Sequence, residues 1–323
     1  MKITVLDGQT LNPGDLSWDA FSQLGETTLY EATSAHQILE RSQDSQALIV
    51  NKVVIDQAVM DQCSELQYIG VVATGYNNVD IAYAAAKGIS VTNVPLYGTA
   101  SVSQMVFAHI LNHACRFTTH VNSVQQGDWI RSSNFCYALA NLSELQGKTI
   151  GIVGLGRTGT QTAQIATAFG MQVIAYHYKE LPPDRAAVYE QGYKRVDLPQ
   201  LFAQSDYVSL HIPLTATNAS MINQELLSLM PSHGFLVNTA RGGLINEQDL
   251  ADALNSDRIA GAGLDVLSTE PPRTDNPLLT AKNCFITPHI AWITKEARER
   301  LLEQSVANLR AWVSGQPINL VKP

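Results

Sequence analysis

The sequence lacks the features that mark several classes of protein. It contains no run of the roughly 18 to 20 apolar residues that a membrane-spanning helix requires. Its opening, Met-Lys-Ile-Thr-Val-Leu-Asp, has no long apolar core typical of a secretory signal. Basic residues number 21 against 29 acidic ones, and no basic cluster offsets the net charge of −8, which argues against a nucleic-acid-binding surface. We therefore expect a cytoplasmic protein that binds neither membrane nor nucleic acid.

Cysteine is also scarce. The four cysteines are scattered, at Cys63, Cys115, Cys136 and Cys284, and form no C-x-x-C pair. Such a pattern predicts reduced thiols and no metal site.

Short apolar runs alternate with helical patterns along the whole chain, which predicts an α/β fold with parallel, doubly wound sheets. At 323 residues the chain exceeds the size at which one core usually keeps growing, so two domains are expected. Strands are expected at 2–6, 47–50, 68–72 and 90–92 in the first part, and at 207–211, 235–238, 261–264 and 284–287 in the second. The amphipathic stretch 295–313 has no strand after it. We expect it to fold back onto the first domain.

Residues 147–176 predict a strand, a glycine turn, a helix and a second strand. The turn carries Gly154, Gly156 and Gly159. At this spacing the first glycine allows a tight bend, the second lets the backbone approach a pyrophosphate, and the third lets helix and strand pack closely. The N-terminus of the following helix would aim its free N–H groups at the phosphates. The segment is therefore predicted to bind a dinucleotide.

Three further signals follow predicted strands, at the edge where doubly wound sheets bind ligands. Arg241 follows the strand 235–238, and a guanidinium can hold a carboxylate in two parallel hydrogen bonds. Glu270 lies in a proline-bounded loop after Asp265 and could orient a histidine by accepting its N–H. His289 follows the last strand and could donate a proton to a carbonyl oxygen as hydride reaches the carbon. Taken singly each residue is more often structural, so the hypothesis rests on the set.

Together these residues resemble the D-2-hydroxyacid dehydrogenase family. The matching elements, in chain order, are Ala-Thr-Gly-Tyr-Asn-Asn-Val-Asp at 73–80, the glycine turn, His-Ile-Pro-Leu at 211–214, Asn-Thr-Ala-Arg-Gly at 238–242, the segment from Asp265 to Pro271, and Pro288-His289. The likeness covers essentially the whole chain. It implies two doubly wound lobes, with a Rossmann NAD(P)-binding domain at 99–291 inserted in a discontinuous, flavodoxin-like substrate domain at 1–98 and 292–323.

The resemblance also implies a role for each matched residue. It makes Arg241 the anchor of the substrate carboxylate, His289 the general acid/base and Glu270 its partner, with Thr74 and Gly75 helping to hold the substrate. The cofactor-binding residues that it implies are Thr74, Gly154, Gly156, Arg157, Thr158, Gly159, His177, His211, Ile212, Pro213, Thr239, Ala240, Arg241, Asp265, His289 and Ala291. The usual assembly of the family is a homodimer built through the segment between the lobes.

The reaction implied is reduction of a small 2-oxo acid to the D-2-hydroxy acid by a reduced nicotinamide cofactor. Within the family, the opening Val-Leu-Asp-Gly, residues 11–16 and His-Ile-Ala-Trp at 289–292 look most like glycerate dehydrogenases, also called hydroxypyruvate reductases. Hydroxypyruvate and glyoxylate, which would give D-glycerate and glycolate, are therefore the expected substrates.

The choice between NAD and NADP stays open. NAD-preferring members carry an acid at the end of the second strand of the nucleotide fold, where it binds the ribose hydroxyls. Here that position holds His177, followed by Tyr178 and Lys179. A missing carboxylate removes the repulsion of a 2′-phosphate, although Glu180 could substitute for it.

Other functions also remain open. The enzyme could act on another D-2-hydroxy acid, or the chain could be a dinucleotide-sensing interaction protein like the C-terminal-binding-protein corepressors, which keep the same three residues. Formate dehydrogenases share the fold but carry Gln in place of the acid beside the histidine, so Glu270 argues against them.

Overall fold

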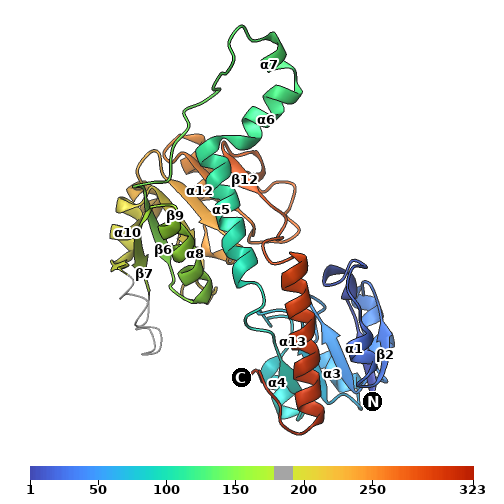
Figure 1. The fold of residues 1–323 in the computed structure, drawn as a ribbon. Coiled ribbons are helices and arrows are strands. Elements are labelled where there is room, and N and C mark those ends of the chain that lie inside the picture. Colours follow the sequence, from blue (N-terminus) through green and yellow to red (C-terminus); the bar gives the residue numbers. More distant parts are fainter. Residues whose placement is uncertain (178–191) are drawn as a thin grey trace. The chain divides into compact units, whose positions relative to one another are not determined.

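The computed structural model describes residues 1–177 and 192–323, and these divide into two compact units (Figure 1). The first unit consists of Met1–Gly98 and Ile293–Pro323, and the second of Thr99–Trp292. Each unit is built around one parallel sheet. None of the helices in the described residues is both long and apolar enough to cross a membrane.

The first unit has a five-stranded sheet in the order β2-β1-β3-β4-β5, which is the flavodoxin order. Its strands are β1 (Lys2–Val5), β2 (Glu26–Leu29), β3 (Ala47–Val50), β4 (Tyr68–Val71) and β5 (Ser90–Thr92). Short helices follow the strands: η1 (Gly8–Thr10), α1 (Asp19–Ser22), η2 (Ala35–Gln37), α2 (Ile38–Ser42), α3 (Gln57–Gln62) and α4 (Ile81–Ala86). The central strands β3 and β4 are buried at every residue, as apolar runs of a covered parallel sheet are.

The edge strand β2 was not expected from the sequence. Its residues Glu-Thr-Thr-Leu are exposed except for the half-buried Thr27. It nevertheless pairs in parallel with β1 along its whole length. An edge strand with so little buried surface gives no apolar pattern to detect.

The C-terminal helix α13 (Lys295–Val313) packs against β4 of the first sheet. The Trp312 ring lies 5.1 Å from that of Tyr68, and the buried Arg298 makes a two-pronged ion pair with Asp15, at 2.6 and 2.7 Å. The residues after α13 continue beside β5, where the Val321 N–H donates to the Val91 carbonyl. Residues 295–313 are thus helical, with the bounds that the sequence predicted.

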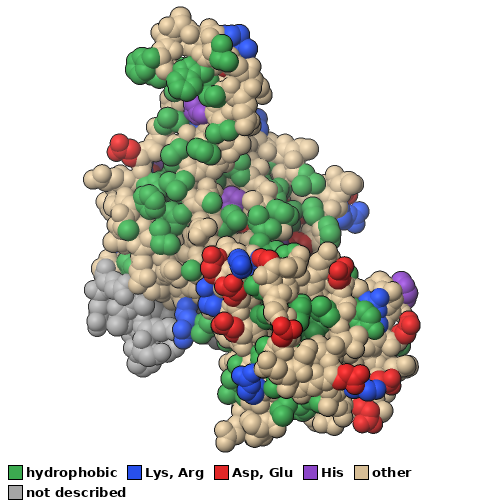
Figure 2. Space-filling model, turned by 45° about the vertical axis from the view of Figure 1, so that its right-hand side comes forward, with side chains coloured by type: hydrophobic (Ala, Val, Ile, Leu, Met, Phe, Trp, Pro, Cys, Tyr) green, Lys and Arg blue, Asp and Glu red, His purple; other side chains and the backbone are tan. Residues whose placement is uncertain are grey.

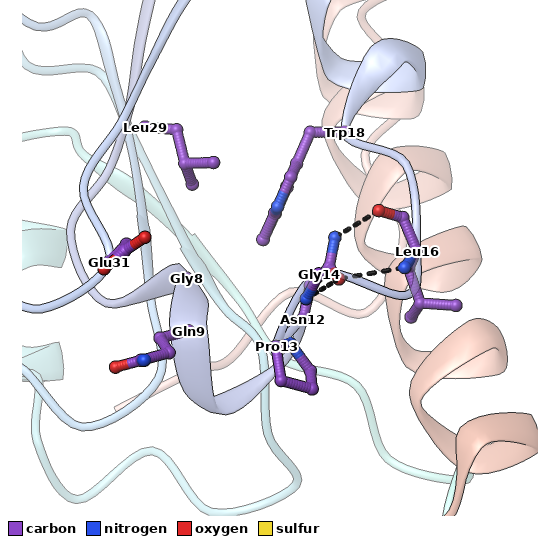
Figure 3. A pocket seen from close by; sticks show the side chains of 9 residues that line it. All are labelled: Gly8, Gln9, Asn12, Pro13, Gly14, Leu16, Trp18, Leu29 and Glu31. Atoms are coloured by element: carbon purple, nitrogen blue, oxygen red, sulfur yellow. Dashed lines mark hydrogen bonds between the residues drawn. The ribbon is translucent and has the colours of Figure 1, made fainter.

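Residues 12–16 form a turn around the side chain of Asn12. Its Oδ1 accepts the N–H groups of Gly14 and Leu16, and its Nδ2 donates to the Leu16 carbonyl (Figure 3). The turn borders a hollow of about 250 Å³, lined also by Trp18 and Leu29 (Figure 3). It also presents Asp15 to Arg298, so this sequence motif has a structural role in fixing the C-terminal helix.

The second unit has a seven-stranded parallel sheet in the order β12-β11-β10-β9-β6-β7-β8. Its strands are β6 (Thr149–Val153), β7 (Gln172–Tyr176), β8 (Lys194–Arg195), β9 (Tyr207–Leu210), β10 (Phe235–Asn238), β11 (Gly261–Leu264) and β12 (Cys284–Ile286). Read from β8, this is the Rossmann order extended by one strand. The predicted α/β class with two doubly wound sheets is confirmed.

Helices cover both faces of this sheet. On one face lie α5 (Thr99–Cys115) and α8 (Arg157–Ala168), whose Val106, Ile110 and Ala163 belong to one apolar cluster with strand residues. The other face carries α10 (Leu198–Gln204), α11 (Gln224–Leu229) and α12 (Glu247–Asn255), packed in a second cluster. Beyond α5, the helices α6 (Phe117–Gln125) and α7 (Asp128–Arg131) extend away from the sheet (Figure 1).

Candidate active site

The predicted site residues of the second unit lie at one edge of its sheet. Because all seven strands are parallel, their carboxyl ends meet at the same edge. The glycine turn follows β6, His177 follows β7, His211 follows β9, Thr239 and Arg241 follow β10, Asp265 follows β11 and His289 lies just after β12. Sequence segments more than 100 residues apart thus converge on one row.

The three glycines of the turn occupy different environments. Gly154 has a φ of +103°, and a Cβ there would lie 2.6 Å from Ile212 Cγ2 and 2.8 Å from the His211 carbonyl oxygen. A Cβ on Gly159 would run into the Gly154 carbonyl oxygen, whereas one on Gly156 would meet no atom within 4 Å. Gly154 and Gly159 therefore make the turn possible, and Gly156 leaves open space in front of its backbone.

The open space lies at the N-terminus of α8. Gly156 caps this helix without a side-chain hydrogen bond, and its first turn, which begins with Arg157 and Thr158, contains no acidic residue. Free N–H groups and the helix dipole there favour an anion. Among the described residues, the buried hydroxyl of Thr239 also has no hydrogen-bond partner. An open phosphate cradle and an unused hydroxyl at the same edge fit a dinucleotide.

His211 packs beside the glycine turn. Its N–H donates to the Val153 carbonyl, and its ring lies 2.9 Å from the Ser209 hydroxyl. Burial lowers the pKa of His211 to about 4, so its ring is neutral at physiological pH. The next residues complete the loop: Ile212 contacts Gly154, and the Pro213 carbonyl accepts from the Asn218 side chain.

The loop that carries Arg241 is braced by the buried Asn238 at the end of β10. Its side chain accepts the Ala240 N–H and donates to the Arg241 carbonyl, at 3.0 and 2.9 Å. A Cβ on Gly242 would run into the backbone of Leu267, so glycine is needed for the two loops to touch. Arg241 itself is exposed, with its Nη1 donating to the Ala240 carbonyl. The Asn238 side chain thus holds the loop, and the Arg241 side chain is accessible.

His289 and Glu270 are in direct contact. The His289 Nδ1 lies 2.6 Å from Glu270 Oε2, and the two side chains are 30% and 36% exposed. The other carboxylate oxygen, Oε1, accepts the Leu267 N–H at 3.0 Å. An ionised Glu270 therefore holds the proton of the ring on Nδ1 and leaves Nε2 for other chemistry. This is the arrangement of an acid/base histidine with an orienting carboxylate.

Asp265 holds the loop on which His289 stands. The side chain of Asp265 is 1% exposed and accepts three hydrogen bonds, from the Thr287 hydroxyl, the Ile290 N–H and the Ala291 N–H. Its carbonyl oxygen accepts the N–H of His289, whose φ is +54°. The left-handed conformation is unfavourable for a residue with a Cβ, and these contacts compensate for it. The Asp265 carboxylate thus faces the loop that carries His289, and its cofactor contact, which the family resemblance implies, stays a prediction.

The remaining predicted residues lie elsewhere or are not described. Thr74 and Gly75 belong to the first unit, in the loop after β4, where the Thr74 hydroxyl donates to the Val94 carbonyl. The half-buried His177 directly follows β7, while 178–180, which include the alternative acid Glu180, lie outside the described residues.

Sequence reasoning missed the residues that support the site. The brace formed by Asn238 could have been suspected, because an amide at a strand end often caps the loop that follows. For Glu247, whose carboxylate accepts the Ser268 N–H near Glu270, no local signal exists. Among the described residues, no cluster of three or more His, Cys, Asp or Glu side chains could hold a metal ion.

Comparison with known proteins agrees with this geometry. The family model described as "D-isomer specific 2-hydroxyacid dehydrogenase, NAD binding domain" matches residues 107–291. The chain belongs to this family. It is 44% identical to a hydroxypyruvate reductase of Blautia hydrogenotrophica, with 99% of both chains covered, and 37% identical to a glycerate dehydrogenase of Methylorubrum extorquens, again over 99% of both.

A solved structure is similar over nearly its full length. The NADPH-dependent glyoxylate/hydroxypyruvate reductase of Sinorhizobium meliloti, in complex with citrate, superposes with a TM-score of 0.83 at 27% identity, covering 99% of this chain and 97% of that one. The protein described here is thus an NAD(P)-dependent oxidoreductase that reduces 2-oxo acids.

The different environments of the glycines give a paired prediction. Gly156→Ala should fold with an unchanged melting temperature but weaken NADH binding by tenfold or more, because the new methyl group occupies the open side of the phosphate cradle. Gly159→Ala should lower the melting temperature, because its Cβ meets the Gly154 carbonyl. Thermal denaturation and NADH fluorescence titration check both. Equal destabilisation by the two substitutions would contradict the assignment.

Proposed function

We propose that the protein reduces hydroxypyruvate, and glyoxylate as a smaller substrate, to D-glycerate and glycolate. The observation that carries the proposal is the His289–Glu270 contact of 2.6 Å, located at the same sheet edge as the glycine turn and Arg241. Nicotinamide cofactors supply hydride, and the chain must supply a proton and hold the substrate carboxylate.

His289 acts as the general acid in the reductive direction. Its Nδ1–H is held by Glu270, so Nε2 carries the proton that passes to the carbonyl oxygen as hydride arrives at the neighbouring carbon. Glu270 stabilises the imidazolium before transfer, as a carboxylate beside a cation does. In the oxidative direction the neutral ring takes the proton back from the hydroxyl group.

Arg241 binds the substrate carboxylate. A planar guanidinium can form two parallel hydrogen bonds with it and fix its orientation, which a lysine cannot. Its exposed position on a braced loop suits this role.

The substrate assignment is supported by the relatives. Two curated relatives that match over 99% of their length are a hydroxypyruvate reductase and a glycerate dehydrogenase, and the solved reductase acts on glyoxylate and hydroxypyruvate.

The ribose end of the cofactor site favours NADPH as one of the coenzymes used. His177 takes the place of the ribose-binding acid, and Nη2 of the exposed Arg195 on β8 lies 3.5 Å from the His177 carbonyl oxygen. A guanidinium beside this position can accept a 2′-phosphate.

Steady-state oxidation of NADH and NADPH with hydroxypyruvate, glyoxylate, pyruvate and a bulkier 2-oxo acid tests the proposal. We expect the highest kcat/KM for hydroxypyruvate and measurable turnover with NADPH. Repeating the comparison with Arg195→Ala should raise the KM for NADPH severalfold and leave that for NADH unchanged. Preference for another acid would change the substrate but keep the mechanism. Absence of turnover with every acid would favour the dinucleotide-sensing role.

Substitution of the three proposed catalytic residues gives separable effects. His289→Ala should lower kcat by about 10²- to 10⁴-fold, the usual worth of general acid catalysis, while the Kd for NADH stays within twofold. Arg241→Ala should chiefly raise the KM for the oxo acid and also lower kcat. Arg241→Lys keeps the positive charge but cannot form two parallel hydrogen bonds with the carboxylate. It should therefore recover little of the kcat/KM that Arg241→Ala loses. Near-normal turnover of His289→Ala would show that another group transfers the proton.

We also propose that the protein is a homodimer assembled through α6, α7 and the loop that follows them. This arm exposes large apolar side chains, including Ile130 at 90% and Phe135 at 89%, and also Phe117, Trp129, Leu139 and Leu142. Hydrophobic side chains gather on the projecting part of the molecule at the top of Figure 2. Apolar patches of this kind mark protein interfaces, and the family resemblance makes a second copy of the chain the occupant.

Sedimentation velocity of Ile130→Lys tests the dimer. We expect the wild type to sediment as a dimer and this variant as a monomer, because a buried lysine without a partner is costly. Leu229→Lys, at an exposed apolar position on α11, is the matched control and should stay dimeric. A monomeric wild type would exclude this assembly.

A further inference from the structure

A buried histidine on α5 is connected to the loop that carries His289. His109 lies on the face of α5 that packs on the sheet, and its side chain is 5% exposed. Its Nε2 lies 3.4 Å from the Thr287 hydroxyl, which in turn lies 2.6 Å from Asp265 Oδ1. The carboxylate of Asp265 then accepts the N–H groups of Ile290 and Ala291. These two residues directly follow His289.

The direction of each hydrogen bond in this chain is fixed. An ionised carboxylate can only accept, so the Thr287 hydroxyl donates to Asp265. The Thr287 oxygen then accepts from His109, whose Nε2 must carry a proton. Burial lowers the pKa of His109, although the charge of Asp265 opposes the shift. The shift favours the neutral ring, and the hydrogen bond to Thr287 places its proton on Nε2.

The sheet is shaped to admit this ring. Gly263 of β11 faces His109, and a Cβ there would lie 2.5 Å from His109 Cβ, 2.6 Å from Cγ and 2.9 Å from Nδ1. A strand residue of any other type would push the imidazole away from Thr287. Glycine in a strand interior costs stability, and here it allows the close approach of α5.

We propose that His109 is a positioning residue for the reaction, and that it orients Thr287 so that Asp265 holds the His289 loop in its reactive conformation. The proposal rests on the proposed function of His289, because it assigns His109 an effect on proton transfer. His109 touches neither substrate nor cofactor in this role. This role requires one hydrogen-bond donor at the position of Nε2 and does not require a positive charge.

The chain provides a matched control on the same helix. His113 lies one turn further along α5, is buried as well, and has a pKa lowered by burial to about 4. Its ring stacks on Phe235 at 4.2 Å. Among the described residues its Nδ1 has no hydrogen-bond partner, and no described contact connects it to Thr287 or Asp265. His113 thus has the residue type and the burial of His109, but it has no described hydrogen bond to Thr287.

Four variants test the proposal by kinetics with hydroxypyruvate. His109→Leu removes the donor and should lower kcat about tenfold, roughly the worth of one lost hydrogen bond, with the KM and the Kd for NADH within twofold. His109→Gln keeps an N–H near the position of Nε2 and should recover most of kcat. Thr287→Val should lose as much as His109→Leu, and His113→Leu should retain the wild-type kcat.

The double variant His109→Leu/Thr287→Val shows whether the two residues act through the same series of hydrogen bonds or independently. Residues that act through one connection are not additive, so the double variant should be no slower than either single one. Additive losses, a loss in His113→Leu equal to that in His109→Leu, or no recovery in His109→Gln would overturn the proposal.

Hydrogen exchange distinguishes this proposal from the function on which it rests. In the cofactor-free protein, the Ile290 and Ala291 amides should exchange at least tenfold faster in His109→Leu than in the wild type or His113→Leu, while core strand amides stay protected. Faster exchange with no turnover in the wild type would refute the proposed function alone. Unchanged exchange at these two amides would refute the role of His109, whatever the activity.

Discussion

The buried carboxylate of Asp265 is the group on which the candidate site depends. It lies at the end of β11 and accepts hydrogen bonds from two backbone N–H groups and one hydroxyl of the next loop. Hydrogen bonds to a charged group contribute about 1.5 to 3 kcal/mol each. Together they exceed the roughly 1 to 3 kcal/mol that a left-handed non-glycine residue costs. The strained conformation of His289, which directs its ring toward Glu270, is stable for this reason.

Glycine at selected positions allows the backbone segments of the site to approach one another. Gly159 brings α8 against the turn at Gly154, Gly242 brings the Arg241 loop against Leu267, and Gly263 brings α5 against β11. In each contact a Cβ in place of the glycine hydrogen would lie less than 3.0 Å from an atom of the neighbouring segment. The glycine turn, Arg241 and His289 therefore lie at one edge of the sheet, on backbone segments that pack closely against their neighbours.

The sequence predicted the elements whose signal is local. The glycine turn, the strand ends and the residues Arg241, Glu270 and His289 follow from short motifs, because parallel strands bring their carboxyl ends together whatever the loop lengths. The edge strand β2 escaped prediction because it buries almost nothing. The orientation of Asp265 toward Thr287 and the link to His109 also escaped it. The first contact joins residues 22 positions apart and the second joins residues 178 positions apart. A local sequence pattern cannot predict contacts between residues so far apart.

A second histidine, His233, also lies beside a carboxylate in this chain. His233 Nε2 lies 2.7 Å from Asp206 Oδ1, compared with 2.6 Å between His289 Nδ1 and Glu270 Oε2. Asp206, however, directly precedes β9, and its other oxygen accepts the N–H of Thr149 at the start of β6. That pair lies at the amino edge of the sheet, opposite the glycine turn and Arg241. Position on the sheet therefore distinguishes the two pairs. Of the two, it is His289 and Glu270 that lie at the edge that also carries the glycine turn and Arg241.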